Sequence, residues 1–146
     1  MSEFPSIMQL IPHREPMILL DEMLGWSQGQ SKCRVTVRDG ARFVEDGRLE
    51  TPLLMEHMAQ AVAVCLGYQA FRGGHGIRVG MIVGCRTFES FTAAAFVGEE
   101  LIVSAEQRGA NASVSGFECE VERDDDCIAR AYLTLYYGDT VNALGA

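Results

Sequence analysis

The apolar residues of this chain recur at two different spacings. Between Ser31 and Arg38 every second residue is apolar, which predicts a strand with one buried face. An earlier apolar run, Met17 to Leu20, also has the length of a strand. Four further strands are expected in the second half of the chain, at 78–91, 99–108, 113–123 and 127–137. The last two alternate clearly, which suits an antiparallel sheet with one solvent-exposed face.

A different pattern separates the two groups of strands. From residue 53 to about residue 71 the chain is rich in Leu, Met and Ala and apolar on nearly all sides. Thr51 and Pro52 precede this segment, and a capping hydroxyl followed by proline is typical of a helix start. A helix that is apolar all round must be buried. A short helical turn is also expected at 6–11, and the polar stretch 39–50 is expected to be a loop.

A single buried helix among strands needs a cover, and an antiparallel sheet curved around it supplies one. We therefore predict an α+β fold in which such a sheet wraps around one long central helix. The 146 residues are expected to form one domain, with an N-terminal segment at 1–12 and a C-terminal tail at 138–146. The edges of the sheet would stay exposed unless another chain pairs with them, so a dimer is expected.

Composition narrows the functional classes. The net charge of −8 argues against nucleic-acid binding, which requires a basic surface. The five cysteines are widely spaced and include no Cys-x-x-Cys pair, so we expect neither disulfides nor a metal site, and a reducing cytoplasm as the compartment. No basic segment followed by an apolar one is seen at the N-terminus, and the longest apolar run, 53–66, is too short to cross a bilayer. We therefore expect no association with a membrane.

Glu56 is the residue that fits this pattern least well. It lies between Met55 and Met58 in the apolar helix, with Gln60 one turn later on the same face. Burial of a carboxylate costs several kcal/mol unless it is hydrogen-bonded or protonated, and a protonated carboxyl can serve as a general acid. Alternatively, this end of the helix reaches the surface, and Glu56 simply favours the positive end of the helix dipole. The residues alone leave both interpretations open.

Three stretches, taken in order, resemble the bacterial 3-hydroxyacyl-acyl-carrier-protein dehydratases, which have the hotdog fold. They are IPHREPMILLD at 11–21, LLMEHMAQA at 53–61 and the segment 83–99, and the resemblance extends from about residue 8 to residue 137. It implies that Glu56 is the catalytic acid and that Gln60 supports it. It also implies a substrate held as a thioester on acyl carrier protein (acyl-ACP), and no cofactor.

One motif of that family is altered. The Gly-His-Phe-Pro segment that carries the catalytic base falls, without a gap, on residues 41–44, and the place of its histidine is taken by Arg42. An arginine stays protonated, so it cannot abstract the α-proton that begins a dehydration. The chain more closely resembles a divergent branch, the predicted second dehydratases of aryl-polyene gene clusters.

The three histidines of the chain are the alternatives for a base. His57 adjoins Glu56, but neighbours on a helix point about 100° apart, so we do not expect it to act with Glu56. His75 lies in a glycine-rich turn and is expected to be solvated. His13 lies between two prolines and matches a family motif, so it is our candidate base. Its alternative role is to hold its loop in place by hydrogen bonds.

The resemblance also suggests how a substrate is bound. Met58, Phe88 and Phe91 would line an acyl tunnel, and Arg86 would hold a phosphopantetheine thioester near its mouth. The function we expect is dehydration of 3-hydroxyacyl-ACP in fatty-acid or polyene synthesis, by a homodimer or by a heterodimer with a related hotdog protein. Two alternatives stay open, a catalytically silent partner subunit of a dehydratase and a hotdog acyl thioesterase.

Overall fold

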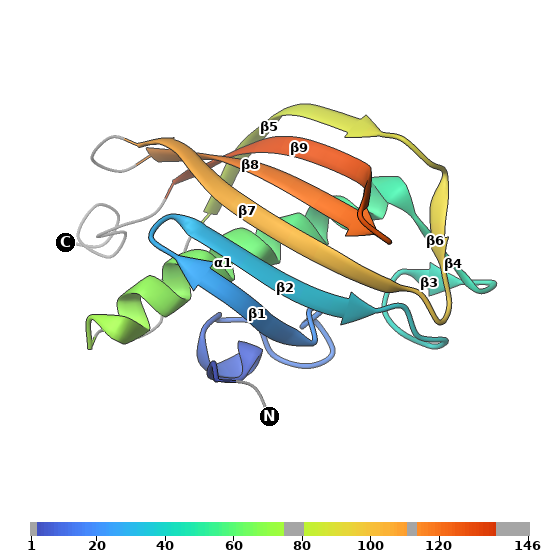
Figure 1. Ribbon diagram of the computed structural model, residues 1–146, viewed down its shortest axis with the longest axis horizontal. Helices are drawn as coiled ribbons and strands as arrows, with labels where there is room; N and C mark the ends of the chain where they lie inside the picture. The colour runs from blue at the N-terminus through green and yellow to red at the C-terminus, as the bar shows by residue number, and fades with distance from the viewer. Residues whose placement is uncertain (1–2, 75–80, 111–113, 137–146) are drawn as a thin grey trace.

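A curved antiparallel sheet is packed against one long helix (Figure 1). The computed structural model describes residues 3–74, 81–110 and 114–136. The six-stranded sheet has the order β1-β2-β7-β8-β9-β5. Its strands are β1 (Glu22–Ser27), β2 (Gln30–Thr36), β5 (Met81–Ser90), β7 (Glu100–Ala110), β8 (Val114–Arg123) and β9 (Asp126–Tyr136). The predicted α+β arrangement, with one central helix, is confirmed.

Smaller elements complete the fold. A three-stranded sheet of order β3-β4-β6 consists of β3 (Val44–Glu45), β4 (Arg48–Glu50) and β6 (Ala94–Phe96). The helices are the 3-10 turns η1 (Ile7–Gln9) and η2 (Thr51–Leu53) and the long helix α1 (Leu54–Arg72). Figure 1 shows the N-terminal segment with η1 below β1, on the same side of the sheet as α1.

The core forms between α1 and the concave face of the sheet. Strand β8 alternates buried and half-buried residues along its length, as its sequence predicts, and turns Phe117, Cys119 and Val121 into the core. On the helix, Met58, Val62 and Cys65 are almost fully buried. These contacts remove apolar surface from water, which is the main force that holds the helix to the sheet.

The N-terminal segment approaches the helix very closely at one glycine. A Cβ atom added at Gly67 would lie 1.9 Å from the carbonyl oxygen of Leu10, so no residue with a side chain fits there without movement of the backbone. Nearby, the indole N–H of Trp26 donates a hydrogen bond of 3.0 Å to the carbonyl of Cys65. The second half of α1 is therefore held from two sides, by the N-terminal segment and by β1.

Two sequence predictions of secondary structure are wrong. The apolar run Met17 to Leu20 is not a strand, because the backbone of this segment bonds to a side chain of α1 and not to a neighbouring strand. The polar stretch 39–50 contains two short strands, β3 and β4, as well as loops. Strands of two or three residues leave too little periodicity for their pattern to be recognised.

Candidate functional site

The start of α1 is fixed by Thr51, which is 1% exposed. Its hydroxyl lies 3.0 Å from the carbonyl of Thr92 and 3.2 Å from that of Ala93, so it can donate to either. The η2 turn then runs directly into the helix. This anchoring sets which side of α1 each residue of the first turn faces, and so determines where Glu56 and His57 point.

Glu56 is half-buried on a strip of α1 that the chain itself does not fully cover. The strip continues one and two turns later with Ala59 and Ala63, which are also half-buried. The Glu56 side chain makes no hydrogen bond or ion pair within the described part of the chain. The carboxyl group is therefore accessible, either to a ligand or to a second chain that covers the strip.

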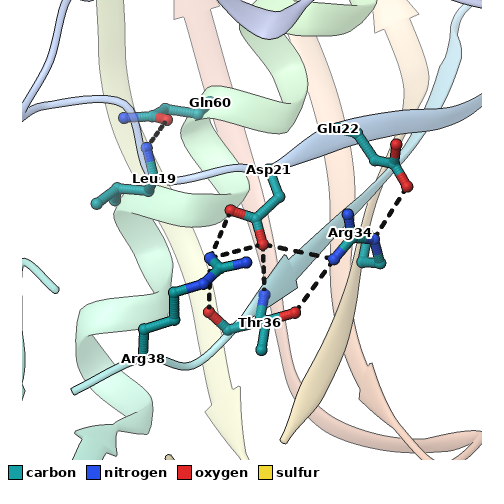
Figure 2. Close-up of polar contacts among 7 residues, drawn as sticks. All are labelled: Leu19, Asp21, Glu22, Arg34, Thr36, Arg38 and Gln60. Atoms are coloured by element: carbon teal, nitrogen blue, oxygen red, sulfur yellow. Dashed lines mark hydrogen bonds and ion pairs between the residues drawn. The ribbon is translucent and has the colours of Figure 1, made fainter. Parts of the chain in front are cut away.

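Gln60 lies one turn after Glu56 but has a different set of partners. It is 1% exposed, and its amide oxygen accepts a hydrogen bond of 2.9 Å from the N–H of Leu19, as Figure 2 shows. Its amide nitrogen donates to the carbonyl of Met17 at 2.8 Å. The side chain thus binds the backbone of the loop as a neighbouring strand would. It positions residues 17–19, and neither of these bonds goes to Glu56.

The same loop is held at its far end by Asp21. Its Oδ2 accepts a hydrogen bond of 2.8 Å from the backbone N–H of Thr36, and its Oδ1 lies 2.9 Å from the guanidinium of Arg38 (Figure 2). Arg34 lies 3.6 Å from the same carboxylate and 3.0 Å from that of Glu22. The negative charge of Asp21 is therefore already compensated by two arginines and a backbone donor.

Between this loop and the end of β2 lies a cavity of about 330 Å³, which we call the His57 cavity. Its walls come from the loop 15–21, from β2 and its end, from residues 40–42 and from β3 and β4. His57 is the residue that α1 contributes, and Arg42 belongs to the lining as well. The position at which the sequence shows arginine in place of a histidine thus borders a cavity that contains a different histidine.

His57 is buried, with only 3% of its surface exposed, and its Nδ1 makes no hydrogen bond. Burial lowers the pKa of His57 from 6.5 to about 4, against a smaller opposing effect of the Leu53 carbonyl. The imidazole is therefore neutral at pH 7. Sequence reasoning set His57 aside because of its position beside Glu56. Its helical spacing from Leu54, Ala61 and Val64, all buried, was the signal for an inward-facing imidazole.

His13, the candidate base, lies in the loop between η1 and β1 and is half-buried. Its Nδ1 is buried and has no hydrogen-bond partner. The guanidinium of Arg14 donates to the carbonyls of His13 and Ile11, at 2.7 Å and 3.2 Å, and so holds the loop. Within the described residues no hydrogen bond or ion pair joins His13 to Glu56, and His13 does not line the His57 cavity.

The four residues expected to bind substrate lie in different surroundings. Met58 is fully buried in the core, and Phe88 is half-buried against it. Phe91 is 53% exposed, and Arg86 is exposed with its guanidinium 5.6 Å from the ring centre of Tyr132. None of the four lines the His57 cavity. Their role in a tunnel stays a prediction. His75, expected to be solvated, lies outside the described residues.

From the sequence we expected neither a metal site nor a segment that crosses a membrane. In residues 3–74, 81–110 and 114–136 no three His, Cys, Asp or Glu side chains come together in a way that could hold a metal ion. No helix in those residues has the length and apolar character needed to cross a membrane.

Comparison with known proteins identifies the fold and the family. The dehydratase heterocomplex ApeI:P from Xenorhabdus doucetiae contains a chain with a TM-score of 0.88 and 24% identity, over 99% of this chain and 100% of that one. A hypothetical thioesterase with coenzyme A from Streptococcus pneumoniae has a TM-score of 0.64 and 11% identity, over 80% and 84% of the two chains. The PaaI protein of E. coli has a TM-score of 0.63 and 16% identity, over 78% and 80%.

These likenesses confirm the predicted hotdog fold. No curated protein sequence matches the chain. Residues 5–145, nearly the whole sequence, match the ApeP-like family, which is described as ApeP dehydratase. The chain therefore belongs to the ApeP-like dehydratase family.

Proposed function

We propose that this chain takes part in the dehydration of a 3-hydroxyacyl thioester on acyl carrier protein, as one half of a heterodimer with a related hotdog chain. Membership of the ApeP-like family supports chemistry of the dehydratase type. The observation that carries the proposal is Glu56. It is a half-buried carboxyl group in the first turn of the central helix, with no hydrogen-bond or ion-pair partner among the described residues.

The proposed reaction needs an acid and a base. The base removes the proton from the α-carbon, and the electron pair of the broken C–H bond forms the new double bond while the 3-hydroxyl group departs. Glu56 donates a proton to that hydroxyl, so that it leaves as water. Arg42 cannot be the base, because a guanidinium stays protonated. A histidine on the partner chain is the base in this proposal, and His13 is the candidate if the chain works alone.

The edge of the large sheet supports the pairing. Strand β5 is the last strand of the order and pairs only with β9. Along it, residues 85–87 are exposed, and no further strand of the described structure pairs with its outer side. Such an edge is a template for a strand of another chain. The similar chain in the ApeI:P heterocomplex supports a partner of the same fold.

The test of Glu56 is a matched pair of substitutions assayed in the presence of a histidine-bearing hotdog partner. We expect Glu56→Gln to fold normally and to lower turnover of 3-hydroxyacyl-ACP by about 10²–10⁴-fold, because the amide keeps the shape but has no acidic proton. Glu45→Gln removes an exposed acid on β3 and serves as the control, with turnover unchanged. Full activity of Glu56→Gln would instead identify the chain as a silent subunit. Release of free acid without the enoyl product would indicate a thioesterase.

A further inference from the structure

The convex face of the large sheet is not covered by any helix of the described structure. In Figure 1 α1 lies behind the strands, and no helix crosses in front of them. Along β2, Ser31, Cys33 and Val35 are buried, whereas the residues between them are exposed or half-buried. The side chains of three neighbouring strands that point away from α1 form a surface that we call the outer face. It consists of Gln30, Lys32 and Arg34 on β2, Ile102, Ser104 and Glu106 on β7, and Glu118, Glu120 and Glu122 on β8.

The register of these strands arranges the charges in rows. Lys32 pairs with Ser104 and Ser104 with Glu120, so β7 separates a lysine from a glutamate. In the next row β7 separates Arg34 from Glu122 in the same way. Neighbouring strands are about 4.8 Å apart, so the two charges of a row lie at similar distances from β7. In these two rows β2 carries the positive charges and β8 the negative ones.

Only part of this charge is compensated within the chain. Lys32 and Glu122 form no ion pair among the described residues. The carboxylate of Glu120 lies 3.9 Å from the guanidinium of Arg130, which is beyond hydrogen-bonding distance. Arg34, by contrast, already has two acidic neighbours on its own chain. The least compensated charges of the two rows are therefore a positive one on β2 and negative ones on β8.

A second copy of the outer face complements the first. A two-fold axis that runs along β7, between two stacked sheets, turns β2 of one copy over β8 of the other and keeps each row opposite itself. Lys32 then lies opposite Glu120 of the second copy, and Arg34 lies opposite its Glu122. The symmetry makes each of these contacts twice. Stacked sheets commonly keep their strands within about 30° of each other, so this arrangement agrees with ordinary sheet packing.

The centre of the outer face leaves room for the side chains of a second sheet. A hollow of about 540 Å³ lies there, bordered by Lys32 and by the small residues Gly25 and Ser104. Glu106, on the central strand, would approach its own copy, but its ion pair of 2.7 Å with Arg108 reduces the repulsion. Five strands of seven residues, the length of β2, cover about 600 Å². This is less than the about 800 Å² per partner of a standard interface, so we expect a reversible contact that is sensitive to salt.

We propose that the outer face binds the outer face of a second copy of this chain, with Lys32 opposite Glu120 of that copy. A uniformly basic or uniformly acidic partner would meet charges of both signs, whereas a second copy matches them row by row. Strand β5 carries none of these residues. The contact is therefore separate from the pairing at the edge of the sheet, and it lies on the face of the sheet opposite the helix that carries Glu56.

Reversal of one charge tests the contact. Lys32→Glu places a glutamate opposite Glu120 of the copy, and Glu120→Lys places a lysine opposite Lys32. Each variant alone is expected to raise the dissociation constant for self-association at least about tenfold, because both copies of the pair change from attraction to repulsion. In an equimolar mixture of the two variants these pairs again have opposite charges. The mixture is therefore expected to associate within about threefold of the wild type.

Sedimentation equilibrium of the full chain measures this association, at about 0.05 M and about 0.5 M salt. The wild-type mass is expected to be larger at the lower salt concentration. Glu45→Lys, the same charge change at an exposed acid of β3, is the control and should associate like the wild type. A wild-type mass that does not depend on salt, or single variants that associate like the wild type, would overturn the proposal. A mixture as weak as the single variants would overturn it as well, because the charges would then face something other than a second copy.

Discussion

Acidification from about pH 7 to about pH 5 is expected to destabilise the fold through His57. The pKa of this buried imidazole is lowered from 6.5 to about 4, with burial as the main cause. At a pH between 6.5 and about 4, His57 is protonated in the unfolded chain but neutral in the folded chain. The free energy of unfolding therefore falls as the pH drops below 6.5. Above that range both states are neutral and the effect disappears. Below the pKa of His57 in the unfolded chain, the free energy of unfolding falls by about 1.4 kcal/mol for each pH unit. At about pH 5 it is therefore about 2 kcal/mol lower than at about pH 7.

Urea denaturation at the two pH values measures this loss. Other groups also titrate in the range, so the result is the difference between the wild-type chain and a His57→Gln variant, which cannot be protonated. We expect the wild type to lose about 2 kcal/mol more than the variant on acidification. A direct NMR titration of the His57 ring should place its pKa well below 6.5. Equal losses in the two proteins, or an ordinary pKa, would refute the argument that His57 is buried and neutral.

Two substitutions test the contacts that hold the N-terminal segment to α1. Gly67→Ala is expected to lower the free energy of unfolding by about 1–3 kcal/mol or more, because the new methyl group would meet the backbone of Leu10. Gly109→Ala, where no atom lies within 4 Å, is the control, and an equal loss there would contradict the clash. Gln60→Leu leaves an N–H of Leu19 and a carbonyl of Met17 without their partner and is expected to cost about 1–3 kcal/mol in total, because both hydrogen bonds are only partly buried. Thermal or urea unfolding measures both, and an unchanged midpoint for Gln60→Leu would show that the loop is held by other contacts.

The pattern of apolar residues predicted most of the secondary structure, because strands and helices that bury one face repeat at fixed spacings. The strand 113–123 and the helix 53–71 were predicted to within a few residues. The segment Met17 to Leu20 was not, since a glutamine 41 residues beyond Leu19 bonds its backbone. No local pattern records a partner at that distance. The strands expected from residue 78 and up to residue 137 extend beyond the described residues at those ends.

The candidate site was predicted only in part. A lone acid in an apolar helix singled out Glu56, but the pattern could not show whether this turn of the helix was covered. The structure places Glu56 half in solvent and turns its neighbour His57 inward. The direction in which each residue faces depends on how η2 and Thr51 fix the start of the helix. The His57 cavity could not be predicted, because its walls come from segments far apart in the sequence.

The most direct test of the account is the turnover of 3-hydroxyacyl-ACP by three samples: the purified chain, a histidine-bearing hotdog partner and the two mixed. We predict that the chain alone is nearly inactive, because Arg42 cannot serve as a base, and that the mixture is far more active than either protein alone. Formation of a one-to-one complex should accompany that activity. Full activity of the chain alone would contradict the account, and survival of that activity in His13→Ala would also exclude His13 as the base.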